Sequence, residues 1–269
     1  MVMALSLGTI VDGIIVGNTL GAQSLAAVNL VLPLTLVFTL LNALIGVGGS
    51  SLIALAKGRR DADAANQVFT VSIGSTLLLS VFFALAGIFL LEPITRIVSG
   101  DHDLKFLVGR YLSVLVYGAP VVILFPVLVY FVRVDGKPEL STAVVILANV
   151  VNLICDLVFI LGFGMDVQGA ALASITGFSV GFLVLFRYFF SADRTLRFVR
   201  PSWAAWKTFW EIVTVGTSSA LAQALLFVQL FASTRSFWAF RANLGSLRFP
   251  SAYPVCPSFP CSSWGPPRR

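Results

Sequence analysis

Residues 140–163 read LSTAVVILANVVNLICDLVFILGF, an apolar run whose one charged residue is Asp156. About 20 such residues in a helix cross the ~30 Å hydrocarbon core of a bilayer. Short polar connectors separate this run from similar ones, which lie at 1–17, 27–56, 66–91, 106–132, 167–190 and 209–231. The pattern predicts an all-α polytopic membrane protein with a six-helix transmembrane lobe and a partial seventh helix.

The composition of the 269-residue chain agrees with this fold class. It is 58% hydrophobic and 11% charged, with a mean hydropathy of +0.94, whereas soluble domains carry about 25% charged residues. A nucleic-acid partner, a disordered chain and a disulfide-stapled secreted module are therefore excluded. No nucleophile, base and orienting acid occur together, and no His or Cys spacing suits a metal. We expect neither an enzyme nor a bound cofactor.

Charge is unevenly divided along the chain. Residues 1–231 hold 13 Lys and Arg against 12 Asp and Glu, whereas residues 232–269 hold five Arg, six Pro and no acid. The division predicts a lobe at 1–190, a basic cytoplasmic linker at 191–208, the start of a seventh transmembrane helix at 209–231 and an irregular tail at 232–269. The tail is interpreted either as a basic segment lying on anionic headgroups or, preferably, as a reading frame that departs near 231–236.

The connectors also predict the orientation of the chain in the membrane. Those after the second, fourth and sixth runs carry ten Lys and Arg residues, and the other three carry at most three. Cytoplasmic loops hold the positive excess in membrane proteins. We therefore expect a multi-pass protein of the plasma membrane with a cytoplasmic amino terminus.

Two acids lie inside the apolar runs, Asp12 and Asp156. A lone ionisable side chain at mid-bilayer costs at least ~2.5–3.5 kcal/mol, so each acid needs a partner or a function. Asn149 and Asn152 precede Asp156 by seven and four residues, which places all three on one helical stripe. That stripe should face protein rather than lipid. The alternative is that each acid caps a helix break or bonds a neighbouring hydroxyl.

Residue counting gives these groups a common depth. Asp12 and Asp156 lie ~9 Å, and Ser174 ~10 Å, inside the outer boundary at ~1.5 Å per residue. Two carboxylates in one low-dielectric pocket cannot both stay charged without a cation, because desolvation and repulsion oppose it. The three residues therefore predict a site for a proton or a small hard cation such as Na⁺.

Several segments in order resemble the multidrug and toxic compound extrusion (MATE) transporters. They are VDGIIVG at 11–17, LAAV at 25–28, GGSS at 48–51, NLICDLVFI at 152–160 and GAALAS at 169–174. The resemblance implies a twelve-helix antiporter of two six-helix lobes, which exports amphipathic organic cations in exchange for Na⁺ or H⁺. It also implies a cation site in the amino-terminal lobe, formed by Asp12, Asn152, Asp156, Ser174 and the carbonyl of Ala170.

The chain departs from the family pattern in three respects. Ser174 stands where the family often has Thr, and only eleven residues precede Asp12. The second lobe is absent after the seventh helix begins. We therefore expect the lipid bilayer as one partner and a missing lobe or a complementing chain as another. Two other functions stay open: a lipid-linked oligosaccharide flippase of the same superfamily, and a membrane fragment that does not transport.

Overall fold

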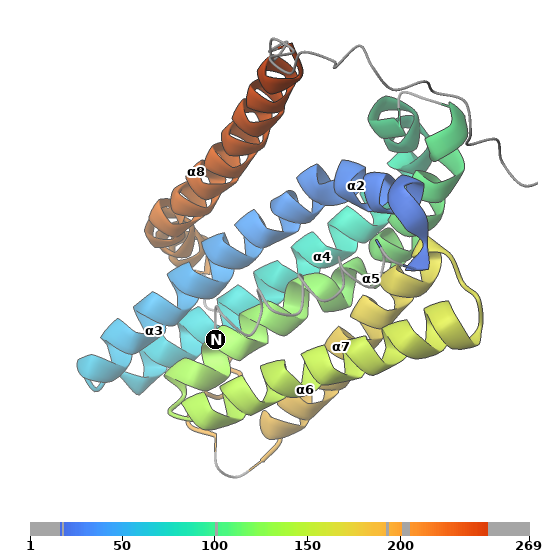
Figure 1. Ribbon diagram of the computed structural model, residues 1–269. Helices are drawn as coiled ribbons and strands as arrows, with labels where there is room; N and C mark the ends of the chain where they lie inside the picture. The colour runs from blue at the N-terminus through green and yellow to red at the C-terminus, as the bar shows by residue number, and fades with distance from the viewer. Residues whose placement is uncertain (1–16, 18, 100–101, 192–193, 201–204, 247–269) are drawn as a thin grey trace, which may run out of the picture. The chain divides into compact units, whose positions relative to one another are not determined.

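The structure is a computed structural model that describes residues 17, 19–99, 102–191, 194–200 and 205–246 (Figure 1). Every regular element in these residues is helical. In chain order they are α2 Gly21–Asn42, η1 Ala43–Val47, α3 Gly48–Gly58, α4 Ala62–Ser99, α5 His102–Val134, α6 Pro138–Asp156, η2 Leu157–Gly162, α7 Val167–Tyr188 and α8 Ala205–Ser246. The two η elements are wider π turns.

Within the described residues, five helices are long and apolar enough to cross a membrane. They run over Gln23–Gly58, Ala62–Ile97, Leu104–Val134, Pro138–Gly162 and Val167–Tyr188. The second to sixth runs expected from the sequence are therefore confirmed in a multi-pass, all-α protein. The first run, 1–17, lies outside the described residues except for Gly17. Helix α8, which starts within the predicted linker, is not among the five.

The chain divides into two compact units, Met1–Leu225 and Leu226–Arg269, and α8 belongs to both. This helix does not end at Phe231, because it continues to Ser246. The irregular tail expected over 232–269 is therefore helical in its first part. The first proline after Phe231 is Pro250, so no proline interrupts the helix between Phe231 and its end at Ser246.

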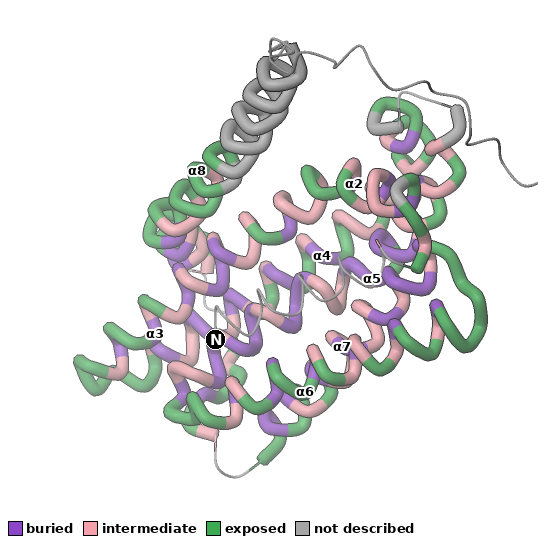
Figure 2. Tube along the Cα trace, in the orientation of Figure 1, coloured by how far each residue is buried: buried purple, intermediate pink, exposed green. Residues whose placement is uncertain are grey.

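Helix α5 is the centre of the first unit. It contacts α2, α3, α4, α6 and α7, and 67% of its apolar window is buried, against 6% for α4. Figure 2 shows the buried residues along α5 and the exposed ones along the outward faces of its neighbours. The exposed faces carry large apolar side chains such as Phe82 and Phe89, as a lipid-facing surface requires.

Glycines let the backbones of three helices meet in the middle of the second span. A Cβ atom on Gly48 would overlap the Ile212 carbonyl oxygen of α8, and one on Gly216 would overlap the Leu44 carbonyl oxygen. A Cβ atom on Gly49 would lie 2.5 Å from the Ser72 hydroxyl oxygen of α4. Small residues permit such close approach where no hydrophobic effect draws helices together.

Replacing Gly216 by Ala should destabilise the first unit, because the added methyl group meets backbone atoms that cannot rotate away. The expected loss is about 2 kcal/mol, measured as a lower midpoint of thermal unfolding in detergent. The matched control is Gly74→Ala, since a Cβ atom there meets nothing within 4 Å. That variant should be unchanged or more stable by up to about 1 kcal/mol. Equal midpoints for both variants would contradict the close crossing.

The three basic connectors meet in one hydrogen-bond network. Asp135, between α5 and α6, lies 2.7 Å from the Nζ atom of Lys57 at the end of α3. The Tyr188 hydroxyl at the end of α7 donates to the same carboxylate at 2.8 Å, and the Thr195 backbone N–H donates to it at 3.1 Å. The three connectors therefore lie at one end of the lobe, and their cytoplasmic location stays a prediction.

This network makes stability depend on pH. Burial would raise the pKa of Asp135, but hydrogen bonds from Lys57, Thr195 and Tyr188 outweigh burial and hold the pKa below its ordinary value. The carboxylate therefore stabilises the folded chain fully above the ordinary Asp pKa of about 3.9. The contribution is lost as the pH falls through the lowered folded-state value.

Asp135→Asn should thus lower the unfolding midpoint most at about pH 7, where the wild-type carboxylate is fully charged. The difference between variant and wild type should shrink below about pH 4, as the wild-type group gains its proton. Thermal unfolding of both proteins across this range checks it. A difference that stays constant with pH would show that the charge contributes nothing.

Candidate functional site

Helix α6 turns one continuous face toward the rest of the lobe. Its buried residues recur every three or four positions: Ser141, Val144, Val145, Ala148, Asn152 and Asp156. The exposed fraction is 6% for Asn152 and 1% for Asp156, and Asn149 is partly buried. The expectation that this polar stripe faces protein is confirmed for Asn152 and Asp156.

A glycine on α7 brings the two helices together at Asn152. A Cβ atom on Gly177 would lie 2.5 Å from the Ala148 carbonyl oxygen and 2.9 Å from the Asn152 Cβ atom. Any larger residue would separate the helices. At this spacing the Asn152 Nδ2 atom donates a hydrogen bond to the Ser174 hydroxyl oxygen, at 3.2 Å. Ser174 therefore contacts the α6 stripe directly, at Asn152, and its depth in the membrane stays a prediction.

The regular part of α6 ends at Asp156 itself. Beyond it, the π turn η2 carries a bond from the Phe163 N–H to the Val158 carbonyl oxygen, five residues back, at 3.0 Å. Such turns interrupt regular pairing and occur often at functional sites. Sequence reasoning treats 140–163 as one uniform helix, and nothing in this apolar run signals the change. Asp156 thus stands where a regular helix gives way to a wider one.

Ala170 lies near the start of α7, one turn before Ser174. It is 8% exposed and packs with Ile160 of η2, against Leu20 and Val28 at the beginning of the second span. The residue whose carbonyl is expected to bind a cation is therefore next to η2.

Of the five expected residues, Asn152 and Ser174 meet at the α6–α7 contact. Asp156 is buried one turn further along α6, and Ala170 packs beside Ile160 of η2. Asp12 lies outside the described residues, so its meeting with Asp156 stays a prediction.

Each group at this contact has an oxygen atom that can act as a ligand for a hard cation. Donation from Nδ2 of Asn152 leaves its side-chain carbonyl as the acceptor end, next to a hydroxyl and a buried carboxylate. Carboxylate, carbonyl and hydroxyl oxygens suit small hard cations, and the carboxylate alone suits a proton. Within the described residues, no group of three His, Cys, Asp or Glu side chains gathers to hold a metal ion. The arrangement favours an alkali cation or a proton.

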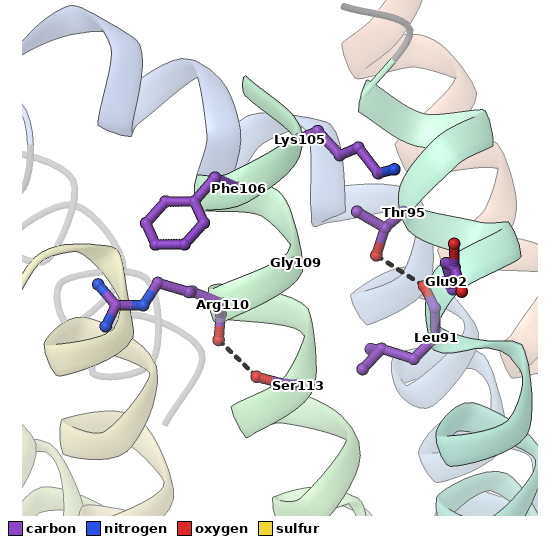
Figure 3. A pocket seen from close by; sticks show the side chains of 8 residues that line it. All are labelled: Leu91, Glu92, Thr95, Lys105, Phe106, Gly109, Arg110 and Ser113. Atoms are coloured by element: carbon purple, nitrogen blue, oxygen red, sulfur yellow. Dashed lines mark hydrogen bonds between the residues drawn. The ribbon is translucent and has the colours of Figure 1, made fainter. Parts of the chain in front are cut away.

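A separate hollow of about 540 Å³ opens between the ends of α4 and α5 (Figure 3). It is lined by Leu91, Glu92, Thr95, Lys105, Phe106, Gly109, Arg110 and Ser113. Lys105 projects toward α4, while Phe106 and Arg110 lie on another side of α5. Arg110 pairs with Asp166 at 3.3 Å and lies 4.9 Å from the centre of the Phe106 ring. Among the described residues, none of the expected cation ligands lines this hollow.

Known proteins match this chain in both sequence and fold. The chain is 32% identical over 185 residues to the multidrug export protein MepA of Staphylococcus saprophyticus subsp. saprophyticus, covering 67% of this chain and 41% of that protein. An inward-facing multidrug resistance MATE family transporter of the MOP superfamily matches with a TM-score of 0.73 and 30% identity, over 81% of this chain and 50% of the other. The outward-facing conformation matches with a TM-score of 0.79 and 28% identity, over 86% and 51%.

The chain spans about half the length of these proteins, or less. Its residues 1–158 match the MatE family model, a range that includes Asp12, Asn152 and Asp156. A match over more than half of the sequence, together with the shared fold, shows that the chain belongs to the MATE family and corresponds to its amino-terminal lobe.

Proposed function

We propose that this chain forms the amino-terminal lobe of a secondary antiporter, which exports amphipathic organic cations and drugs in exchange for Na⁺ or H⁺. The coupling ion binds at Asp156 with Asn152, Ser174, the Ala170 carbonyl and Asp12. The lobe works with a second lobe, in the plasma membrane, with the amino terminus in the cytoplasm. No other cofactor takes part.

One observation carries this proposal: a carboxylate that is 1% exposed lies one helical turn from an amide bonded to a hydroxyl of the next helix. Ionisable groups at membrane depth are costly and mark ion pathways or proton relays. Here Asp156 lies one turn from Asn152, on the same buried face of α6, and its carboxylate suits a cation or a proton. The site thus has a chemical use for an acid that the bilayer otherwise disfavours.

The matched proteins support an exporter rather than a flippase. MepA is named a multidrug export protein, and both solved relatives are multidrug resistance transporters. A phosphate-bearing lipid cargo would favour basic side chains inside the lobe. Arg110, near the end of its span, is instead paired with Asp166. An organic cation has no such requirement.

The experiment uses a two-lobe transporter that contains this chain, in membrane vesicles where an ion gradient drives export of a cationic dye. Asp12→Asn and Asp156→Asn should each abolish this export. Asparagine keeps the shape of each side chain but removes the charge that holds the coupling ion. Both variants should still reach the membrane in folded form. Dye export at the wild-type rate by both variants would contradict the coupling role.

Two variants serve as controls in the same vesicles. Asp166→Asn makes the same chemical change at a carboxylate that is half-exposed and outside the site, and should export normally. Ser174→Thr keeps the hydroxyl that accepts from Asn152 and should also export, whereas Ser174→Ala should require a higher Na⁺ or H⁺ concentration. Equal behaviour of Ser174→Ala and Ser174→Thr would remove Ser174 from the site.

A further inference from the structure

The segment after α7 lies along the first lobe and bonds to it at every second residue. The backbone N–H of Thr195 donates to Asp135 at 3.1 Å, that of Arg197 to the Asn66 side-chain carbonyl at 2.8 Å, and that of Val199 to the Thr70 hydroxyl at 3.1 Å. We call residues 194–200 the anchored linker. The acceptors come from the α5–α6 connector and the first half of α4.

The intervening residues of the anchored linker pack against the core. Leu196 is 1% exposed and belongs to the main buried cluster. The Phe198 ring lies 4.9 Å from the ring of Phe69, which also stacks on Phe189 at 5.1 Å. An extended segment shows this alternation, because successive side chains point in opposite directions. Polar and apolar contacts therefore hold residues 195–199, with Leu196 buried and Phe198 52% exposed.

Asp135 is the charged acceptor in this set of hydrogen bonds. Its carboxylate accepts hydrogen bonds from Lys57, from the Tyr188 hydroxyl and from both the hydroxyl and the backbone N–H of Thr195. Lys57 also donates to the Val134 carbonyl oxygen at 3.2 Å and to the Thr195 hydroxyl at 2.6 Å. The Asp135 carboxylate is buried while Lys57 is partly exposed and Thr195 is exposed, so the network bonds a buried charge to groups at the surface and favours one arrangement around it.

The start of α8 joins the same core. Ile212 is fully buried in the main cluster, with Ala205 and Phe209 packed against it. Four residues separate the anchored linker from Ala205. Leu196 of the anchored linker and Ile212 of α8 thus belong to the same buried cluster.

We infer that Asp135 is a positioning residue, which fixes the anchored linker on the first lobe, where the linker shares one buried cluster with the start of α8. Residues 194–200 then belong to the folded lobe and are not a loose connection between two parts of the chain. The consequence for transport rests on the proposed function, because in a two-lobe antiporter this segment joins the lobes. The structural claim itself needs no second lobe.

Hydrogen exchange of the 269-residue chain in detergent tests the structural claim. Asp135→Asn should raise the exchange rates of the backbone amides of Thr195, Arg197 and Val199 at least about tenfold. The bond from Thr195 to Asp135 is lost first, and the rest of the anchored linker then opens more often. Exchange over Val144–Asn152 of α6 should stay as in the wild type. Glu139→Gln is the matched control, since it neutralises an exposed acid four residues away and should change nothing.

Two milder variants keep the test decisive if Asp135→Asn loosens the whole lobe. Tyr188→Phe removes one bond to Asp135 and should speed exchange over 194–200 about threefold. Asn66→Ala should expose the Arg197 amide and leave the Thr195 amide protected. Unchanged exchange over 194–200 in both Asp135→Asn and Tyr188→Phe would overturn the inference, as would global loosening by Asp135→Asn with no local effect of Tyr188→Phe.

A second readout addresses transport separately. In the two-lobe protein, Tyr188→Phe should lower the maximal export rate at least about threefold and leave the substrate concentration for half-maximal rate unchanged, since the cation site is intact. An unchanged maximal rate, or a change in the half-maximal concentration alone, would overturn the consequence for transport. Failure of the proposed function would appear as no export by the wild type, while the exchange result would stand.

Discussion

Close contact between the backbones of α6 and α7 at Gly177 is the constraint on which the candidate site depends. In a bilayer, helices gain little from burying apolar surface, so packing of small residues and polar contacts must hold them together. Gly177 allows the Asn152 amide to reach Ser174. Asp156 lies one turn beyond Asn152 on the same buried face of α6. A single added methyl group at Gly177 would act directly on the contact between Asn152 and Ser174.

A second set of close contacts organises the other side of the lobe. Helix α5 contacts most of the other helices of the lobe. The adjacent glycines Gly48 and Gly49 of the second span allow α8 and α4 to approach closely. The Asp135 network then ties the connectors at one end of these helices to each other. The proposed cation site and the anchored linker are thus separate parts of one lobe. The proposed site would use buried oxygens for a mobile ion, whereas the linker is held by the Lys57–Asp135 ion pair and its hydrogen bonds.

Hydropathy and helical spacing were sufficient to predict five spans, the buried face of α6 and the grouping of the basic connectors at one end of the lobe. These features follow from local periodicity, which the bilayer imposes on each span in turn. The π turns were not predictable, because one extra residue in a turn leaves the apolar pattern intact. The bonds between Thr195 and Asp135 join residues 60 positions apart, and no local pattern encodes them. The continuation of α8 past Phe231 was missed because charge and proline content dominated the interpretation of 232–269.

The central claim is that the Asp156 carboxylate exchanges a cation with its surroundings. Infrared difference spectroscopy on the purified chain in lipid bilayers tests it most directly, with Asp156→Asn used to assign the carboxyl band. The account predicts that this band shifts when Na⁺ is added at constant pH, or changes from carboxylate to carboxylic acid when the pH is lowered. A band that responds to neither ion would contradict it.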